Sequence, residues 1–209
     1  SATALAGALV CPTPHPNTDV SVRLLNTAWS TTKEQTVIAG GGTRAVRFPF
    51  TVGVIEHPTG TITVDAGLGH QSRIGRYPFW ASTKSGAAIG PGMTLVEQLG
   101  AAPSTVLVTH MHSDHISGLL DMSPSTTVWV TQREWQSART SNVAFDARRF
   151  EDAVQWKPVP LEARNSLQVL GRPAMDVAGD GTVWYLSTPG HTPGSASALV
   201  RTATEVWLF

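Results

Sequence analysis

One short stretch limits the folds open to this chain more than any other feature. Residues His110–His115, with the sequence HMHSDH, directly follow Thr105–Thr109, an apolar run with the β-branched composition of a buried strand. Alternate residues at the end of a strand point the same way, so the first two histidines can bind one ion. The following turn brings the aspartate and the last histidine to a neighbouring position. The stretch predicts a metal site at the carboxyl end of a strand, where α/β folds place ligands; the alternative is a hydrogen-bonded polar loop.

A second histidine motif lies further along the chain. Ser187–Ser195, with the sequence STPGHTPGS, places His191 after a predicted strand and between two Pro-Gly turns that fix its direction. A single histidine in a turn is more often structural than functional. Together with the upstream cluster, however, His191 is the expected remaining ligand of the first ion.

The rest of the chain predicts a mixed α/β fold in which short strands dominate. Alternating or β-branched runs predict strands over Val20–Leu25, Val46–Glu56, Thr61–Val64, Thr105–Thr109, Thr127–Thr131, Leu167–Leu170, Met175–Val177, Val183–Ser187, Ala196–Arg201 and Glu205–Phe209. Helical spacing predicts short helices over Thr94–Leu99, over Ile116–Leu120 and from Gln132 onward. Residues 67–92 are predicted to form a long surface loop, and residues 142–160 show no sustained period.

Composition excludes several classes of protein. Lys+Arg and Asp+Glu both number 15, so no excess of positive charge is present to bind nucleic acid. The single cysteine, Cys11, rules out an internal disulfide and a cysteine-cluster metal site. Residues 1–19 are interpreted as an N-terminal tail or the remnant of an export segment too short to span a membrane, and residues 20–209 as one domain. This favours a periplasmic or secreted location.

Together, the two histidine motifs resemble those of the metallo-β-lactamase superfamily over residues 20–209. The resemblance implies a four-layer αβ/βα sandwich with metals at one edge, between two sheets. It assigns His110, His112 and His191 to a first metal, and Asp114 and His115 to a second. Asp65, at the end of a predicted strand, matches the family's buried aspartate that orients the ligand loop; a turn-capping role is the alternative for this residue.

The sequence departs from the family pattern at its end. Family members continue past a strand such as Glu205–Phe209 to an aspartate that bridges both metals, and then supply one more histidine, whereas this chain stops at Phe209. It therefore resembles a C-terminally truncated form that lacks its last strands. We expect the second metal position to be weak or empty. We also expect the uncovered edge either to pair with a second copy as a homodimer or to lower stability.

The resemblance implies a hydrolase that uses a metal-bound hydroxide and one or two Zn²⁺ ions. Asp114 is the candidate catalytic residue, because it could orient the nucleophile and carry a proton to the leaving group. The second motif is similar to that of acyl-homoserine-lactone lactonases and organophosphate-cleaving members, so a lactone, an ester or a related small molecule is the expected substrate. The aromatics Phe79, Trp80 and Trp135 are candidates for its pocket, or else they pack in the core.

Three other functions remain open at this point. Thioester hydrolysis of the glyoxalase II kind lies within the same class. Members that are persulfide dioxygenases bind a single Fe²⁺ through comparable ligands, and iron content with oxygen consumption would identify such an oxidoreductase. A chain without the bridging aspartate could also be an inactive truncated fragment.

Overall fold

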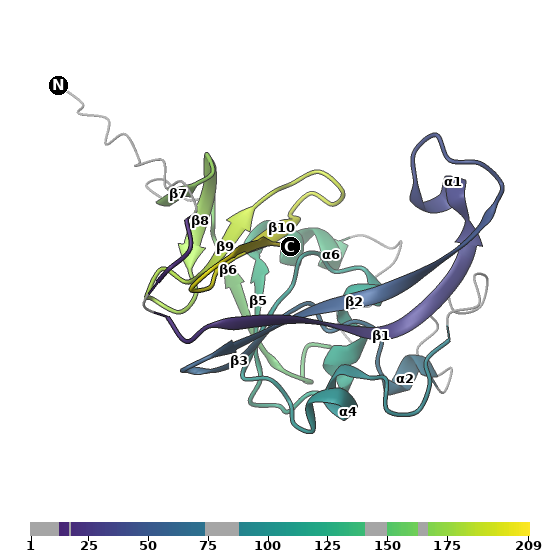
Figure 1. Ribbon diagram of the computed structural model, residues 1–209, viewed down its shortest axis with the longest axis horizontal. Coiled ribbons are helices and arrows are strands. Elements are labelled where there is room, and N and C mark those ends of the chain that lie inside the picture. Colours follow the sequence, from purple (N-terminus) through teal and green to yellow (C-terminus); the bar gives the residue numbers. More distant parts are fainter. Residues whose placement is uncertain (1–12, 17, 74–87, 141–149, 163–166) are drawn as a thin grey trace.

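The computed structural model describes residues 13–16, 18–73, 88–140, 150–162 and 167–209, and Figure 1 shows their arrangement. The predicted α/β class is confirmed, because two β-sheets pack together and short helices connect the strands. Residues 1–12 of the predicted tail lie outside the described part. Among the described residues, no helix is long and apolar enough to cross a membrane.

The first sheet has six strands in sequence order, and the pairing of neighbouring strands changes from antiparallel to parallel across it. Its strands are β1 (Ser21–Lys33), β2 (Ala45–His57), β3 (Gly60–Val64), β4 (Thr105–Leu107), β5 (Thr127–Thr131) and β6 (Gln155–Val159). The first three pair antiparallel, and the pairs from β3 to β6 are parallel. In the parallel part, the carboxyl ends of neighbouring strands meet at one edge of the sheet.

Two differences from prediction concern this sheet. Strand β1 continues well past Leu25 and, with β2, forms the long curved arm in Figure 1, where the Arg47 guanidinium lies over the ring of Trp29. Strand β6 was not predicted, because it carries Pro158 and two charged or amide side chains and shows only weak alternation. A proline is tolerated there because β6 forms the edge of the described sheet.

The second sheet is antiparallel throughout and has the order β11-β10-β9-β8-β7. Its strands are β7 (Leu167–Val169), β8 (Arg172–Asp176), β9 (Val183–Ser187), β10 (Ala196–Arg201) and β11 (Val206–Leu208). The predicted strands are confirmed, although β8 begins three residues earlier than expected, at Arg172. Leu170 and Gly171 both have positive φ in the tight turn before it, a conformation that the hydrophobic pattern does not reveal.

The helices within the described residues are all short. They are α1 (Glu34–Val37), α2 (His70–Arg73), α4 (Leu95–Leu99), α5 (Ser113–Ile116), the 3-10 helix η1 (Ser117–Asp121) and α6 (Gln132–Thr140). Apolar side chains of these helices pack onto one face of the first sheet, among them Leu95, Ile116, Leu119 and Ala138. The helix predicted over Ile116–Leu120 is in fact the end of α5 followed by η1, so the histidine cluster itself begins a helix.

The two sheets meet through a second hydrophobic cluster that includes Ile55, Leu107 and Tyr185. Two hydrogen bonds tie the sheets together directly behind the histidine cluster. The Tyr185 hydroxyl donates to the carbonyl of Val108 at 2.5 Å, and the Ala196 N–H donates to the carbonyl of Thr109 at 2.7 Å. The start of β10 is therefore fixed against the residue that precedes His110.

Candidate metal centre

Two loops carry the predicted ligands. The first ligand loop, residues 108–115, begins where β4 ends, and the second ligand loop, residues 188–195, connects β9 to β10. Val108 is still buried, Thr109 turns the chain, and His112 adopts extended backbone angles as the N-cap of α5. Helix α5 then carries Asp114 and His115 in its single turn. The segment after the strand thus presents two histidines, and helix α5 presents Asp114 and His115. The spacing predicted the same two groups but placed Asp114 and His115 on a turn.

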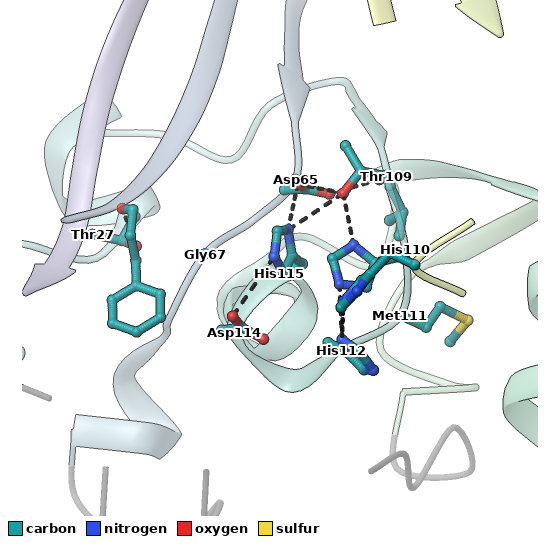
Figure 2. Close-up of polar contacts among 12 residues, drawn as sticks. Thr27, Asp65, Gly67, Thr109, His110, Met111, His112, Asp114 and His115 are labelled. Carbon is teal, nitrogen blue, oxygen red and sulfur yellow. Dashed lines mark hydrogen bonds and ion pairs between the residues drawn. The ribbon is translucent and has the colours of Figure 1, made fainter. Parts of the chain in front are cut away.

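Asp65 lies at the exit of β3 and holds this loop from the neighbouring strand. Its carboxylate accepts the Thr109 N–H at 2.7 Å and the Thr109 hydroxyl at 2.8 Å, and it lies 2.6 Å from Nδ1 of His115 (Figure 2). It has a φ of 64°, a conformation that aspartate tolerates better than most residues. The contact engages Nδ1 of His115 with a carboxylate, so Nε2 is the nitrogen of this ring that could bind a metal ion.

Asp65 also changes the charge of His115. Burial acts to lower the pKa of His115, but the charge and hydrogen bond of Asp65, together with the charge of Asp114, outweigh it and raise this pKa to about 9. In the metal-free protein at neutral pH, His115 is therefore a cation. It must release a proton to become a ligand, because only a neutral imidazole nitrogen binds a metal ion.

The three predicted ligands of the first metal come together from two distant segments. Nε2 of His110 lies 2.9 Å from Nδ1 of His112, and Nε2 of His191 lies 3.0 Å from the same atom. One ligand atom from each of the three residues falls within 4.8 Å of the others. Two nitrogens bound tetrahedrally to zinc are about 3.3 Å apart, so this triad, His110, His112 and His191, fits a zinc-like ion that keeps a fourth position open.

The charge states of His110 and His112 are suited to metal binding. Burial is the main effect that lowers the pKa of His110 to about 2, and the neighbouring imidazoles add to it. Burial and then the charge of His191 likewise lower the pKa of His112. Both rings therefore stay neutral at physiological pH, with a nitrogen lone pair available to an ion.

The sequence interpretation missed a residue that contacts both ligand loops. Glu134, on α6, is buried and accepts hydrogen bonds from the backbone N–H of Met111 and from the Thr192 hydroxyl. The pattern Thr131-Gln-Arg-Glu134 carried a signal, because a Thr followed three positions later by Glu is typical of a helix cap. That signal predicts the helix start but not the direction in which the carboxylate points.

A pocket of about 220 Å³ opens beside Asp114 and His115. Its lining combines an apolar wall from β2 with the polar end of the ligand loop: Phe48, Pro49, Phe50, Thr51, Asp65, Gly67, Asp114 and His115. Sequence reasoning missed this wall, because alternation in a long strand does not say which residues reach a neighbouring loop.

The aromatics that were predicted to line a pocket lie elsewhere or are not described. Trp135 packs against Trp156, with ring centroids 4.7 Å apart. Both rings also contact the hydrophobic core between the helices and the first sheet. This position favours the packing alternative for Trp135. Phe79 and Trp80 lie outside the described residues.

Curated relatives include hydrolases of two kinds. The N-acyl homoserine lactonase AttM of Agrobacterium fabrum is 25% identical over 197 residues, which cover 88% of this chain and 72% of that protein. AttM of Azorhizobium caulinodans is 29% identical over 51% of this chain and 40% of its own length. The hydroxyacylglutathione hydrolase of Cereibacter sphaeroides is 32% identical over 50% of this chain and 32% of its own length. The chain thus matches less than half of the last two relatives.

Solved structures share the fold. An N-acyl homoserine lactone hydrolase with N-hexanoyl-L-homoserine at its catalytic metal centre superposes with a TM-score of 0.64 at 17% identity, over 87% of this chain and 70% of that one. A probable metal-dependent hydrolase from Staphylococcus aureus gives 0.65 at 15% identity, over 91% and 72%. The family model described as the Beta-lactamase superfamily domain matches residues 61–191, which include both histidine motifs. With fold and motifs in agreement, the chain belongs to the β-lactamase superfamily.

Proposed function

We propose that this chain carries the metal centre of a hydrolase that opens a lactone or cleaves a related ester of a small molecule. The observation that carries the proposal is the convergence of His110, His112 and His191 on one point. Zinc is the proposed ion, because three imidazoles with an open fourth position form the ligand set typical of catalytic zinc. A solved lactonase of this fold is described as dizinc, which supports the choice.

Bound in this triad, a zinc ion would activate water as a nucleophile and stabilise the negative charge that develops on the substrate carbonyl oxygen. Asp114 would orient that water and pass a proton to the leaving oxygen. Its position supports this role, because its carboxylate is partly exposed, faces the pocket and lies 3.6 Å from Nε2 of His115. In this proposal Asp114 and His115 are also the ligands of any second ion.

The pocket supports a substrate with an apolar part. Phe48 and Phe50 lie 5.3 Å apart between ring centroids and line the same pocket as Asp114. An acyl or alkyl group could pack on these rings while the carbonyl group faces the metal centre. The names of the lactonase relatives are consistent with this class of substrate.

Thioester hydrolysis is the second candidate, favoured by one observation. The hydroxyacylglutathione hydrolase of Cereibacter sphaeroides has 32% identity to the matched half of the chain, higher than either lactonase relative described above. The same chemistry serves both substrates, because a thioester presents the same kind of carbonyl group to the nucleophile.

The first experiment is elemental analysis of the purified chain, with His112→Ala as the test variant and His70→Ala as its control, since His70 is exposed and outside the triad. We expect about one zinc per wild-type chain, the same for the control and almost none for His112→Ala. One iron per chain with oxygen consumption would instead favour the dioxygenase. A wild-type chain that retains no metal would contradict the proposal. A parallel assay of N-acyl homoserine lactones, aryl esters and acyl thioesters then separates the substrate classes.

A further inference from the structure

The two segments that supply the triad are joined by a single buried carboxylate. Glu134 is 2% exposed, and within the described residues no lysine or arginine forms an ion pair with it. Its Oε1 accepts the N–H of Met111 at 2.9 Å. Its Oε2 accepts the Thr192 hydroxyl at 2.7 Å and the Gly194 N–H at 3.1 Å. All three donors belong to ligand loops, since Met111 lies between two triad histidines and Thr192 follows the third.

The surrounding residues make this contact close and specific. A Cβ added to Gly194 would lie 2.1 Å from the backbone nitrogen of Glu134, so the second loop packs directly on the start of α6. The Thr131 hydroxyl completes the junction, because it donates to the Gly194 carbonyl at 2.6 Å and accepts the Glu134 N–H at 3.0 Å. The Ser195 hydroxyl accepts the Thr192 N–H at 2.9 Å and holds the turn in shape.

A buried carboxylate without a cation is energetically unfavourable unless several donors satisfy it. Glutamine has the same size but only one acceptor oxygen, so it would turn an N–H group toward at least one of the three donors. A backbone link between the two segments lies at the base of the site, where the Ala196 N–H donates to the Thr109 carbonyl at 2.7 Å. Glu134 acts nearer the ligands and on both loops at once.

We propose that Glu134 is a positioning residue for the metal centre: its carboxylate sets the distance between the loop that carries His110 and His112 and the loop that carries His191. It does so without contacting the ion. The inference rests on the proposed metal site, since a fixed spacing between the loops has a chemical purpose only if the three imidazoles bind one ion. Loss of the carboxylate displaces His191 from the other two ligands.

The test measures zinc affinity and the electronic spectrum of the cobalt-substituted protein for wild type, Glu134→Gln and the control Glu162→Gln. Glu162 is a suitable control because it loses the same charge nearby, where it accepts the Ser187 hydroxyl and is 48% exposed. We expect a roughly 10- to 100-fold loss of zinc affinity in Glu134→Gln, as for other groups that orient ligands. We also expect an altered cobalt spectrum, whereas the control should match wild type in both.

A role in stability alone would give a different result. Glu134→Gln would then unfold more easily but would bind zinc with wild-type affinity in its folded fraction and show the wild-type cobalt spectrum, and this would overturn the inference. If wild type itself binds no zinc, the proposed function and the inference both fail.

A second pair of variants keeps the test valid if Glu134→Gln does not fold. Thr192→Val removes one donor to Glu134 with little change of shape, and Thr192→Ser retains the hydroxyl. We expect Thr192→Val to lose zinc affinity and Thr192→Ser to recover it. Equal affinity of the two variants would overturn the inference.

Discussion

The two halves of the candidate metal centre are built in different ways. The triad draws its ligands from both sheets, and His191 lies 79 residues along the chain from His112. Asp114 and His115 instead come from one turn of α5, and Asp65 on the neighbouring strand holds His115. The first half therefore depends on packing between distant segments, and the second half depends on one local helix and one carboxylate.

This difference is consistent with separate roles for the two halves, one in binding the ion and one in contacting the substrate. The convergent triad is held by Glu134 and by the sheet-to-sheet hydrogen bonds, which suits the binding of an ion. The local pair faces the pocket beside Phe48 and Phe50, which suits contact with a substrate. If the division is correct, variants in the two halves should affect different measured quantities.

The largest effect is expected from Asp114→Asn, which tests the local half. Asparagine keeps the size of the side chain but cannot carry a proton, so turnover of a lactone should fall roughly 10²- to 10⁴-fold. Zinc content should change little, because the triad is intact. Steady-state kinetics together with elemental analysis check this expectation, and a parallel loss of turnover and zinc would mean that Asp114 mainly binds metal.

Gly194→Ala tests the convergent half. Its new methyl group would overlap the backbone of Glu134 and push the His191 loop outward. We expect a loss of about 100-fold in zinc affinity, at the upper end of the effect of ligand-orienting groups, and a loss of about 1–3 kcal/mol in stability, as for other overpacked positions. Chelator competition and denaturant unfolding measure the two. The control is Gly190→Ala in the same loop, where an added Cβ meets nothing within 4 Å.

Asp65→Asn should have a smaller effect, of about tenfold, on turnover and on binding of a second equivalent of metal. Asparagine tolerates the positive φ of this position and can still accept the Thr109 N–H, but it removes the charge that faces His115. Calorimetric titration with zinc should show the first equivalent unchanged. If the first equivalent weakens as much as the second, the two halves are not independent.

The smallest effect is expected far from both halves, at Glu97→Gln in the capping box of α4. The backbone N–H of Thr94 and the Arg73 side chain lower the pKa of Glu97 from 4.5 to about 2. Its contribution to stability is therefore present above pH 4.5 and lost as the pH falls through about 2. Thermal unfolding of wild type and variant should differ slightly at neutral pH and converge in acid, with no change in zinc affinity at neutral pH. A difference in stability that persists at the lowest pH would contradict the role of the charge.

Most of the fold could be predicted because its strands carry period-two alternation between clear turns. The exceptions have local causes. Strand β6 is an edge strand with a proline, and the end of β1 lies on an arm with little core to impose a pattern. Helix α5 is a single turn of four residues, too short for helical periodicity to reveal it.

The candidate ligand set could be proposed from the sequence for another reason. His110, His112, Asp114 and His115 occupy one segment, and His191 is marked by its two Pro-Gly turns. Glu134 and the phenylalanine wall were not predictable, because their roles arise only when α6 and β2 are packed beside loops that are distant in sequence. The spacing of ligand residues within one segment can be read from a sequence, but the tertiary contact between two distant segments cannot.

The wide sequence separation of the triad also bears on the order in which the protein folds. Bringing His112 and His191 together closes a long loop, and the loss of chain entropy opposes this step until other contacts stabilise it. The three histidines should therefore meet only after the second sheet has docked. An ion that recognises only this late arrangement would slow unfolding and leave the rate of folding unchanged. Stopped-flow measurements with and without zinc can check this, and faster refolding in zinc would mean that the ligand loops meet early.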